Sequence, residues 1–423
     1  MNNNYSLLRA TRMQSTERAR FGTAKVSAAL VLAALSCVTT QPAMAQKHYD
    51  PGATDTEIKI GQTMPYSGAG SVYGTIGKTE LAYFKMINEQ GGINGRKINL
   101  ISLDDGYAPP RTVEQIRRLV EEDQVLFTFQ VLGTAHNTAV QRYLNARKVP
   151  QLFISTGATK WGDPQHFPWT MGWLPPYQHE AGIYAKYVVQ NKPSAKIAIL
   201  YQNDDYGKDY LKGFKDGLGD KAPKMIVAEM SYEPTDPTID SQIVSLQASG
   251  ADVFFDISIP KFAAQAIRKS YDTGWRPLHI INNVSSSITA TLQPAGLDKS
   301  VGLISSGYLK DPTDPAWKDD KAMKDYASFM KKYYPEANPD DTINLYGYSA
   351  AYTLVQVLKQ CGDELMRENV MRQAANLKDF EVPVLLPGIK INTSPTDYYP
   401  IKQVQLMRFD GRTWVRFGEL MSR

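Results

Sequence analysis

One stretch, residues 57–100, constrains the fold of this chain more than any other part of the sequence. It opens with apolar side chains at alternate positions, Ile58 and Ile60, which is the period of a β-strand. The alternation stops at the sequence PYSG, residues 65–68, whose composition favours a turn. A second strand begins at Ile98, after a helical segment. Strand, turn, helix and strand in this order predict a parallel sheet with helices on its faces.

The helical segment of this unit begins at Thr75, where the apolar period changes. It ends at Gly91 and Gly92, because glycine adopts the left-handed conformation that closes a helix at no steric cost. The apolar residues that share one face of the helix are Ile76, Tyr83, Phe84 and Ile87.

The same alternation of strand and helix continues along the chain, and it predicts doubly wound α/β domains. Short apolar runs typical of strands lie at 125–129, 151–154, 197–201, 253–257, 279–281 and 301–305. Amphipathic segments typical of helices lie at 112–122, 135–147, 179–190, 209–218, 239–249 and 261–273. Near the end of the chain, residues 401–417 alternate at period two around Asp410-Gly411, which predicts a β-hairpin.

Three segments interrupt the alternation, at residues 167–177, 308–317 and 382–387. The first is rich in aromatic residues and proline, and the second contains Pro312 and Pro315. We interpret all three as crossings between two domains.

The turn after the first strand contains Gly68, Gly70 and Gly74, but their spacing is GxGxxxG rather than the GxGxxG of dinucleotide sites. The nearest acidic pair, Asp104-Asp105, comes too late in the chain to bind a ribose. We therefore prefer a loop that receives a carboxylate on its backbone N–H groups and the Ser67 hydroxyl over a nucleotide site.

The first 45 residues have the features of an export signal: a basic start, an apolar run at 26–38 and Ala43-Met44-Ala45 as a cleavage site. A lipoprotein signal cut before Cys37 is the alternative. The signal holds five basic and one acidic residue, which leaves 42 of each in the remaining chain. That balance gives no reason to expect nucleic acid as a partner. Only Cys361 remains after processing, so no internal disulfide can form.

No group of residues predicts an enzyme. The five histidines are scattered without the spacing of a metal site. The sequence around Ser349, GYSAA, lacks the final glycine of a hydrolase nucleophile turn and opens a helical segment. We expect no catalysis, no metal and no cofactor, and we interpret the chain as a binding protein.

Several short motifs together resemble the periplasmic solute-binding proteins of ABC transporters, of the Leu/Ile/Val-binding type and its aromatic-acid-binding members. They are PYSG at 65–68, Tyr73-Gly74, GGINGRKI at 91–98, the loop 155–159 and Asp205-Tyr206-Gly207. The resemblance covers nearly all of the chain after about residue 55. GGINGRKI is its most specific part.

The resemblance implies a type I periplasmic binding protein fold, with two doubly wound α/β lobes joined by a three-segment hinge. The N-terminal lobe would comprise residues 46–173 and 306–384, and the C-terminal lobe residues 174–305 and 385–423. It also implies a monomer in the periplasm that binds a small-molecule carboxylate in the cleft and delivers it to an inner-membrane ABC permease.

The family's binding residues correspond to eleven positions here. Three loops of the first lobe would hold a carboxylate through hydroxyl and N–H groups. Where the family commonly has a serine in the second loop, this chain has Gly133, and Thr134 can supply the hydroxyl instead. The positions are Tyr66, Ser67 and Tyr73; Gly133 and Thr134; Ser155, Gly157 and Thr159; and, from the second lobe, Tyr206, Asn283 and Val284.

The chain departs from amino-acid binders at the loop 280–288, which contains no acid to pair with a ligand ammonium; Val284 lies nearest the expected carboxylate. A desolvated ammonium without a counter-charge costs several kcal/mol. We therefore predict a small hydrophobic carboxylic acid, and an aromatic one because aromatic residues gather near the cleft. These are Tyr66, Tyr73, Trp161, Trp173, Tyr177 and Tyr206.

Three alternatives remain open. The first is uptake of branched-chain or other apolar amino acids, which needs an ammonium partner elsewhere in the chain. The second is a sensory binding module, although no signalling domain accompanies it in this sequence. The third is a hydrolase, for which Ser349 is the single candidate nucleophile.

Overall fold

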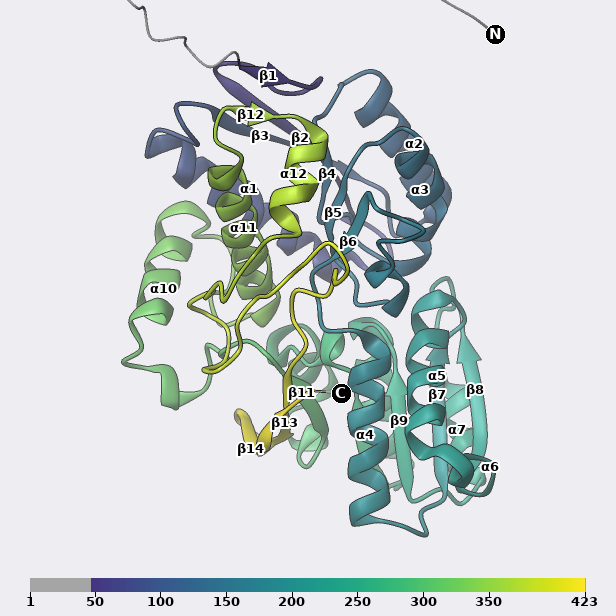
Figure 1. The fold of residues 1–423 in the computed structure, drawn as a ribbon. Helices are drawn as coiled ribbons and strands as arrows, with labels where there is room; N and C mark the ends of the chain where they lie inside the picture. Colours follow the sequence, from purple (N-terminus) through teal and green to yellow (C-terminus); the bar gives the residue numbers. More distant parts are fainter. Residues whose placement is uncertain (1–46, 423) are drawn as a thin grey trace, which may run out of the picture. The chain divides into compact units, whose positions relative to one another are not determined.

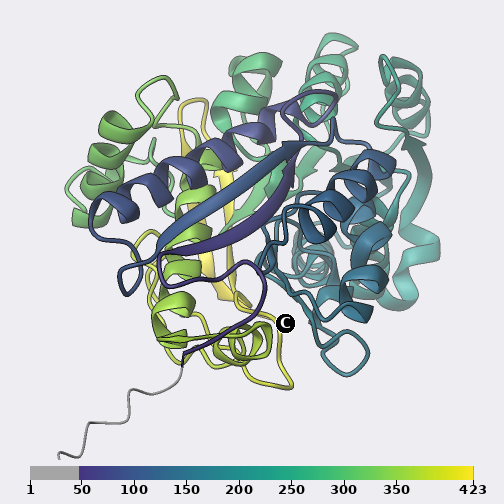
Figure 2. The same ribbon diagram turned by 90° about the horizontal axis from the view of Figure 1, so that it is seen from above.

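The computed structural model describes residues 47–422, which contain two large β-sheets (Figure 1). The first sheet has five parallel strands in the order β3-β2-β4-β5-β6. They are β2 (Glu57–Met64), β3 (Lys97–Asp104), β4 (Thr128–Phe129), β5 (Gln151–Ile154) and β6 (Thr170–Gly172). β2 and β3 lie side by side and pair along their whole length, from Glu57 with Lys97 to Met64 with Asp104 (Figure 2).

The second sheet has seven strands in the order β14-β13-β11-β10-β9-β7-β8. They are β7 (Ile197–Gln202), β8 (Ile226–Tyr232), β9 (Val253–Ile257), β10 (Leu278–Ile281), β11 (Ile304–Gly307), β13 (Val404–Phe409) and β14 (Trp414–Met421). The strands from β8 to β11 are parallel, and β13 pairs antiparallel with β11 and with β14. The hairpin predicted around Asp410-Gly411 is therefore confirmed.

Helices cover both sheets. With the first sheet are α1 (Gly74–Glu89), α2 (Pro109–Glu121), α3 (Thr134–Ala146), α10 (Lys321–Tyr333), α11 (Thr342–Cys361) and α12 (Arg367–Ala374). With the second are α4 (Tyr177–Asn191), α5 (Asp205–Leu218), α6 (Ala222–Met225), α7 (Asp240–Ala248), α8 (Pro260–Asp272) and α9 (Gln293–Ala295). The strand–helix–strand unit at 57–100 and the two doubly wound lobes are confirmed.

The end of α1 follows from its two glycines. Gly91 and Gly92 have φ of 101° and 72°, values that other residues adopt with strain. A Cβ atom on Gly92 would also lie 2.1 Å from the carbonyl oxygen of Arg96. The turn between α1 and β3 therefore requires glycine at this position.

Three segments connect the two lobes: the residues between β6 and α4, the residues after β11, and the residues between α12 and β13. The second and third pair with each other in antiparallel fashion. Lys310 N donates to Val384 O over 2.9 Å, and Leu386 N donates to Tyr308 O over 2.8 Å. The predicted lobe boundaries at 173/174, 305/306 and 384/385 stay a prediction.

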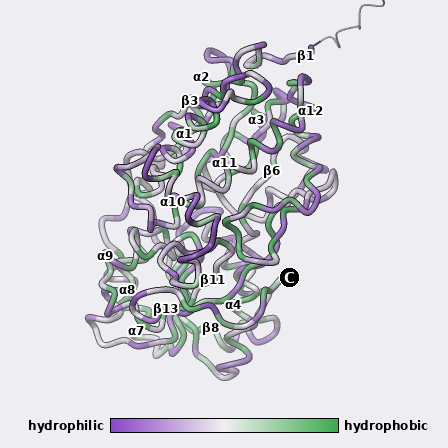
Figure 3. Tube along the Cα trace, turned by 90° about the vertical axis from the view of Figure 1, so that its left-hand side faces the viewer, coloured by the Kyte–Doolittle hydropathy of each residue, from purple (hydrophilic) through white to green (hydrophobic). Residues whose placement is uncertain are grey.

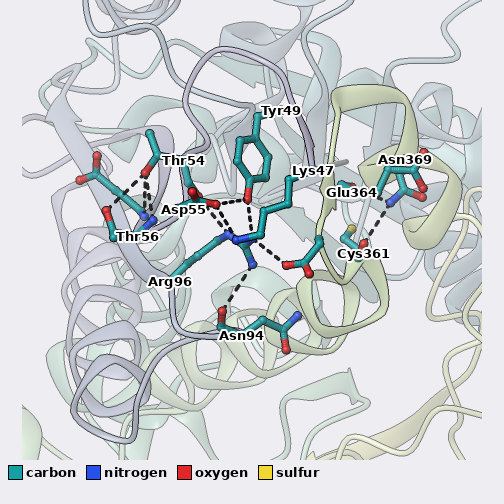
Figure 4. Close-up of polar contacts among 12 residues, drawn as sticks. Lys47, Tyr49, Thr54, Asp55, Thr56, Asn94, Arg96, Cys361, Glu364 and Asn369 are labelled. Carbon is teal, nitrogen blue, oxygen red and sulfur yellow. Dashed lines mark hydrogen bonds and ion pairs between the residues drawn. The ribbon is translucent and has the colours of Figure 1, made fainter. Parts of the chain in front are cut away.

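Arg96, which belongs to the GGINGRKI motif, has a structural role (Figure 4). Its guanidinium is 1% exposed and donates to Thr54 O over 2.9 Å, to Tyr49 Oη over 2.6 Å and to Asp363 Oδ1 over 2.7 Å. These bonds connect the motif to the short strand β1 (His48–Tyr49), to the segment before β2, and to the residue that precedes the short strand β12 (Glu364–Leu365). The strands β1 and β12 pair with each other. The arginine of the motif is therefore structural.

Hydrophobic and hydrophilic stretches alternate along the trace (Figure 3). Across residues 47–422, no helix is both long and apolar enough to cross a membrane. The predicted export signal at 1–45, including Cys37, lies outside the described residues.

Candidate functional site

A cavity of about 120 Å³ opens where loops from both lobes meet. It lies at the carboxyl ends of the parallel strands, where open α/β sheets bind their ligands. Gly133 and Thr134 follow β4, and Ser155 follows β5; Tyr206 follows β7, and Asn283 follows β10. The strand order of each sheet thus places these four distant segments around one space.

One wall of the cavity offers neutral hydrogen-bond donors. Thr134 begins α3, and the residue before it, Gly133, provides no side-chain cap. The first N–H groups of the helix therefore have no partner within the helix and favour an anion. The hydroxyls of Thr134 and Thr156 lie 2.5 Å apart, and Thr156 donates to Tyr177 Oη over 3.2 Å.

The remaining wall is aromatic and apolar. Six tyrosines line the cavity: Tyr73, Tyr107, Tyr177, Tyr206, Tyr308 and Tyr346. Burial raises the pKa of Tyr73 and Tyr206 well above the ordinary value, so these phenols stay neutral. No lysine or arginine is among the described residues that line the cavity.

The structure brings together seven of the eleven predicted site residues. They are Tyr73, Gly133, Thr134, Ser155, Tyr206, Asn283 and Val284. Tyr73, from the first lobe, donates its hydroxyl to Val284 O of the second lobe over 2.9 Å. Tyr206 accepts a hydrogen bond from the side chain of Asn282.

The other four predicted residues do not line the cavity, because each is engaged elsewhere. Ser67 Oγ donates to Asp104 Oδ2 over 2.6 Å, and Tyr66 Oη lies 2.6 Å from Ser102 Oγ. The Thr159 N–H and hydroxyl both donate to Asp209 Oδ2, over 2.8 Å and 2.9 Å. A Cβ on Gly157 would lie 2.4 Å from Pro175 O, so this glycine serves close packing.

A neighbouring side chain requires glycine at position 133. Its φ is 98°, and a Cβ there would lie 2.2 Å from His136 Nδ1. The His136 ring is held in place by Tyr107, with 4.6 Å between ring centroids. The serine expected from the family therefore has no room in this chain.

Sequence reasoning missed Asp311, the one acid among the described residues that line the cavity, which lies on the segment after β11. Its Oδ1 accepts hydrogen bonds from Thr313 N over 2.9 Å and from Thr313 Oγ1 over 2.8 Å. The pKa of Asp311 is raised to about 6, with burial as the largest cause and the charges of Asp314 and Asp340 as smaller ones. No sequence motif marks this position, because the break at 308–317 has no periodicity that predicts its path.

The two tryptophans predicted near the cleft support the cavity from behind. Trp173 packs against Tyr346 and Tyr308, with ring centroids 5.4 Å and 6.1 Å apart, and its indole N–H donates to Thr353 Oγ1 over 3.2 Å. Trp161 is buried as well, and neither lines the cavity.

Ser349, the candidate nucleophile of the hydrolase alternative, is fully buried in α11 and donates to Tyr346 O over 2.7 Å. That bond and the tight packing explain the residue without catalysis. In the part of the chain that the structure describes, no cluster of three or more histidine, cysteine or acidic residues could hold a metal ion.

These features define a two-lobed α/β binding protein whose ligand cavity lies between the lobes. Residues 57–413 match the family model described as periplasmic binding protein, so the chain belongs to that family. Its fold is that of the type I periplasmic binding proteins, as predicted.

Curated relatives agree with this assignment. The chain is 24% identical over 316 residues to Leu/Ile/Val-binding protein homolog 1 of Brucella abortus, covering 74% of this chain and 80% of that protein. It is 24% identical over 225 residues to an amino acid binding protein of Pseudomonas aeruginosa, covering 52% of this chain and 58% of that protein.

Solved structures share the fold. A substrate-binding periplasmic protein from Ralstonia solanacearum superposes with a TM-score of 0.77 at 22% identity, covering 85% of this chain and all (100%) of that chain. A branched chain amino acid ABC transporter protein from Thermus thermophilus with bound valine gives 0.78 at 14% identity, covering 88% and 98%. A fatty acid ABC transporter substrate-binding protein from Thermomonospora curvata gives 0.75 at 21%, covering 89% and 95%.

Proposed function

We propose that this protein is the periplasmic substrate-binding component of an ABC importer and that it closes on a small hydrophobic, aromatic carboxylic acid. The family assignment supports the transport role, and two structural neighbours are named as a fatty acid ABC transporter substrate-binding protein and a branched chain amino acid ABC transporter. One observation carries the ligand class: a tyrosine-rich cavity with neutral donors and no lining lysine or arginine among the described residues.

The carboxylate end of the ligand fits the wall formed by Thr134, Ser155 and the start of α3. Hydroxyl and N–H donors can bind a buried anion well, because hydrogen bonds to charged groups are the stronger kind. The unpartnered N–H groups at the start of α3 add the favourable field of a helix N-terminus.

The body of the ligand fits the rest of the cavity. Tyrosine rings and the apolar side chains of Ile76, Leu132 and Val284 surround it. The loop after β10 contributes Asn283 and Val284 and no acid. An aromatic acid satisfies this surface, since rings stack on or pack edge to face with tyrosine.

A second candidate is an apolar amino acid, and Asp311 favours it. Asp311 is an acid in the cavity wall, so a ligand ammonium could find a counter-charge there rather than in the loop after β10. The two candidates differ in a single chemical group, the α-amine.

Matched ligands test that difference. We expect 3-phenylpropionate and 4-methylpentanoate to raise the melting temperature of residues 46–423, and phenylalanine and leucine, their α-amino counterparts, to leave it unchanged. The opposite pattern would establish amino-acid binding and overturn the proposed ligand class.

Variants of the donor wall test the carboxylate site. Thr134→Val removes a hydrogen bond to a charged group, which is typically worth about 1.5–3 kcal/mol. We expect affinity for the bound acid to fall roughly ten- to hundred-fold by titration calorimetry. Ser67→Ala is the matched control, because the Ser67 hydroxyl donates to Asp104 outside the cavity, and it should leave affinity unchanged. Equal affinities for Thr134→Val and wild type would contradict the assignment.

A further inference from the structure

We propose that Asp311 is a specificity-determining residue that selects acids carrying a hydroxyl group away from the carboxylate, so that a hydroxylated aromatic acid binds better than its parent. The inference rests on the proposed function, because it names a second contact of the same ligand. It starts from the position of one carboxylate in the cavity wall.

Asp311 has one oxygen available to a ligand. Both hydrogen bonds from Thr313 go to Oδ1, and Oδ2 has no hydrogen-bond partner among the described residues. The residue lines the cavity, so this oxygen is the acceptor that a ligand can reach. A ligand that fills the cavity would exclude water from this oxygen, and an acceptor left without a partner is costly, which makes a donor on the ligand favourable.

No protein cation competes for this oxygen. The neighbouring basic groups already pair with other acids: Lys310 Nζ lies 2.7 Å from Asp320 Oδ2, and Arg416 Nη2 lies 3.4 Å from Asp314 Oδ2. The acid Asp341 accepts hydrogen bonds on Oδ1 from Ser287 Oγ at 2.8 Å and from Ile343 N at 3.0 Å, and it is not among the described residues that line the cavity.

The surroundings of Asp311 favour a hydroxyl over an ammonium. Leu309, Ile343, Met407 and Trp414 contribute apolar surface to the same cavity. An ammonium carries three N–H donors, whereas a hydroxyl needs one acceptor, and Asp311 leaves one carboxylate oxygen free. A phenol combines this single donor with the flat body that the tyrosine wall accepts. A site built to accept a hydroxyl discriminates against the analogue that lacks it, because its own polar group is then left unpaired.

Calorimetric titration of full mature protein with matched pairs tests the inference. The pairs are benzoate with 4-hydroxybenzoate, cinnamate with 4-hydroxycinnamate, and 4-methylbenzoate with 4-(aminomethyl)benzoate. In wild type we expect 4-hydroxybenzoate, 4-hydroxycinnamate or both to bind at least tenfold more tightly than the unhydroxylated acid of the same pair. Asp311→Leu should remove this advantage and bind the parent acids at least as well. Asp311→Asn, whose amide oxygen still accepts a hydrogen bond, should keep part of it.

Asp319→Asn is the matched control, since Asp319 lies on the surface with a side chain 91% exposed and pairs with Lys324. Circular dichroism confirms folding of each variant. The inference is refuted if acids bind but their hydroxyl group gives no gain in affinity, or if the gain persists in Asp311→Leu. Either result would leave the proposed function standing. Tightest binding of the aminomethyl ligand would assign an ammonium partner to Asp311 instead. If amino acids bind and none of the acids without an α-amine binds, both this inference and the proposed function are overturned.

Discussion

At the scale of single residues, Gly133 shows how a side chain one helical turn away decides what a binding loop can contain. The position has a left-handed backbone, and His136 fills the space where a Cβ would lie. The two residues therefore form a pair: a serine at 133 would require a smaller residue at 136. Thr134, the next residue, lines the cavity and can provide the hydroxyl that Gly133 lacks.

We expect Gly133→Ala to lower stability by about 1–3 kcal/mol, because it combines a strained φ with a steric clash. The double variant Gly133→Ala/His136→Ala should be less destabilised than the sum of the two single variants, because the clash is gone. Urea unfolding of the four proteins measures this coupling. Additive free energies would show that His136 does not restrict position 133.

Asp311 predicts a pH dependence of stability in the absence of ligand. Its pKa in the folded protein is about 6, above the ordinary 3.8, with burial as the largest cause. Between these values the folded protein holds a proton that the unfolded chain has released, so this contribution to stability is present at pH 4 and is lost as pH rises through 6.

We therefore expect Asp311→Asn to gain stability relative to wild type between pH 4 and pH 7.5, by at most about 3 kcal/mol. Melting temperatures across that range measure the gain, with Asp319→Asn as the control. A constant difference between Asp311→Asn and wild type at all pH values would contradict the raised pKa.

The sequence could predict those site residues that follow strands with clear periodicity. Thr134, Ser155 and Tyr206 lie directly after such strands, and the fold places their loops at the cavity. Ser67 and Thr159 also follow strands, but their hydroxyls bond to Asp104 and Asp209, whose positions depend on three-dimensional packing. Asp311 could not be predicted because it lies in a crossing segment without regular structure.

At the scale of secondary-structure elements, the first turn of α5 joins the two lobes. Asp205 accepts hydrogen bonds from Thr138 Oγ1 over 3.0 Å and from Lys160 Nζ over 2.6 Å, both from the first lobe. One turn later, Asp209 holds the N–H and hydroxyl of Thr159. These hydrogen bonds and the ion pair lie outside the cavity and connect the two lobes.

The Lys160–Asp205 ion pair should affect ligand release more than ligand recognition. Its side chains are 38% and 47% exposed, and pairs of this kind are worth at most about 1 kcal/mol. We expect Lys160→Met to raise the dissociation rate of the ligand up to about fivefold, with little change in the association rate. Stopped-flow measurements test this.

Lys212→Met is the control for that experiment. Lys212 pairs with Asp216 within α5 and makes no contact across the lobes. Equal dissociation rates for Lys160→Met and Lys212→Met would show that the first turn of α5 does not stabilise the closed form.

The regular elements themselves were predictable from periodicity, because both lobes bury strands between layers of amphipathic helices. β5, β7 and β9 match the predicted apolar runs closely. β4 is shorter than the predicted run at 125–129, although Leu126 N and Phe127 O still bond to β2. The pairing of residues 308–310 with 384–386 was not predictable, since these short segments lie more than seventy residues apart and carry no period.

At the scale of the whole molecule, the hydrogen bond from Tyr73 to Val284 O connects the two lobes at the cavity. We expect this contact to open when a ligand enters or leaves. Hinge closure about a few connecting segments is a known motion of two-lobed binding proteins, and we expect the three segments that connect the lobes to allow it here.

We expect small-angle scattering to show a smaller radius of gyration at saturating ligand than in its absence. Tyr73→Phe, which removes the bond to Val284, should leave the saturated profile compact and weaken affinity. Identical profiles with and without ligand would mean that the protein is closed before binding.

Trp414 has a consequence for how binding can be observed. It is the one tryptophan among the described residues that line the cavity, and its indole N–H donates to Ser286 O over 2.8 Å. Because indole fluorescence responds to nearby groups, a bound aromatic acid should quench or shift the emission of the unlabelled protein. Trp414→Phe should abolish this response, whereas Trp275→Phe, which alters a ring stacked on Phe254 within the second lobe, should preserve it. If Trp414 responds in this way, unknown compounds can be screened against the protein by its own fluorescence, without a label.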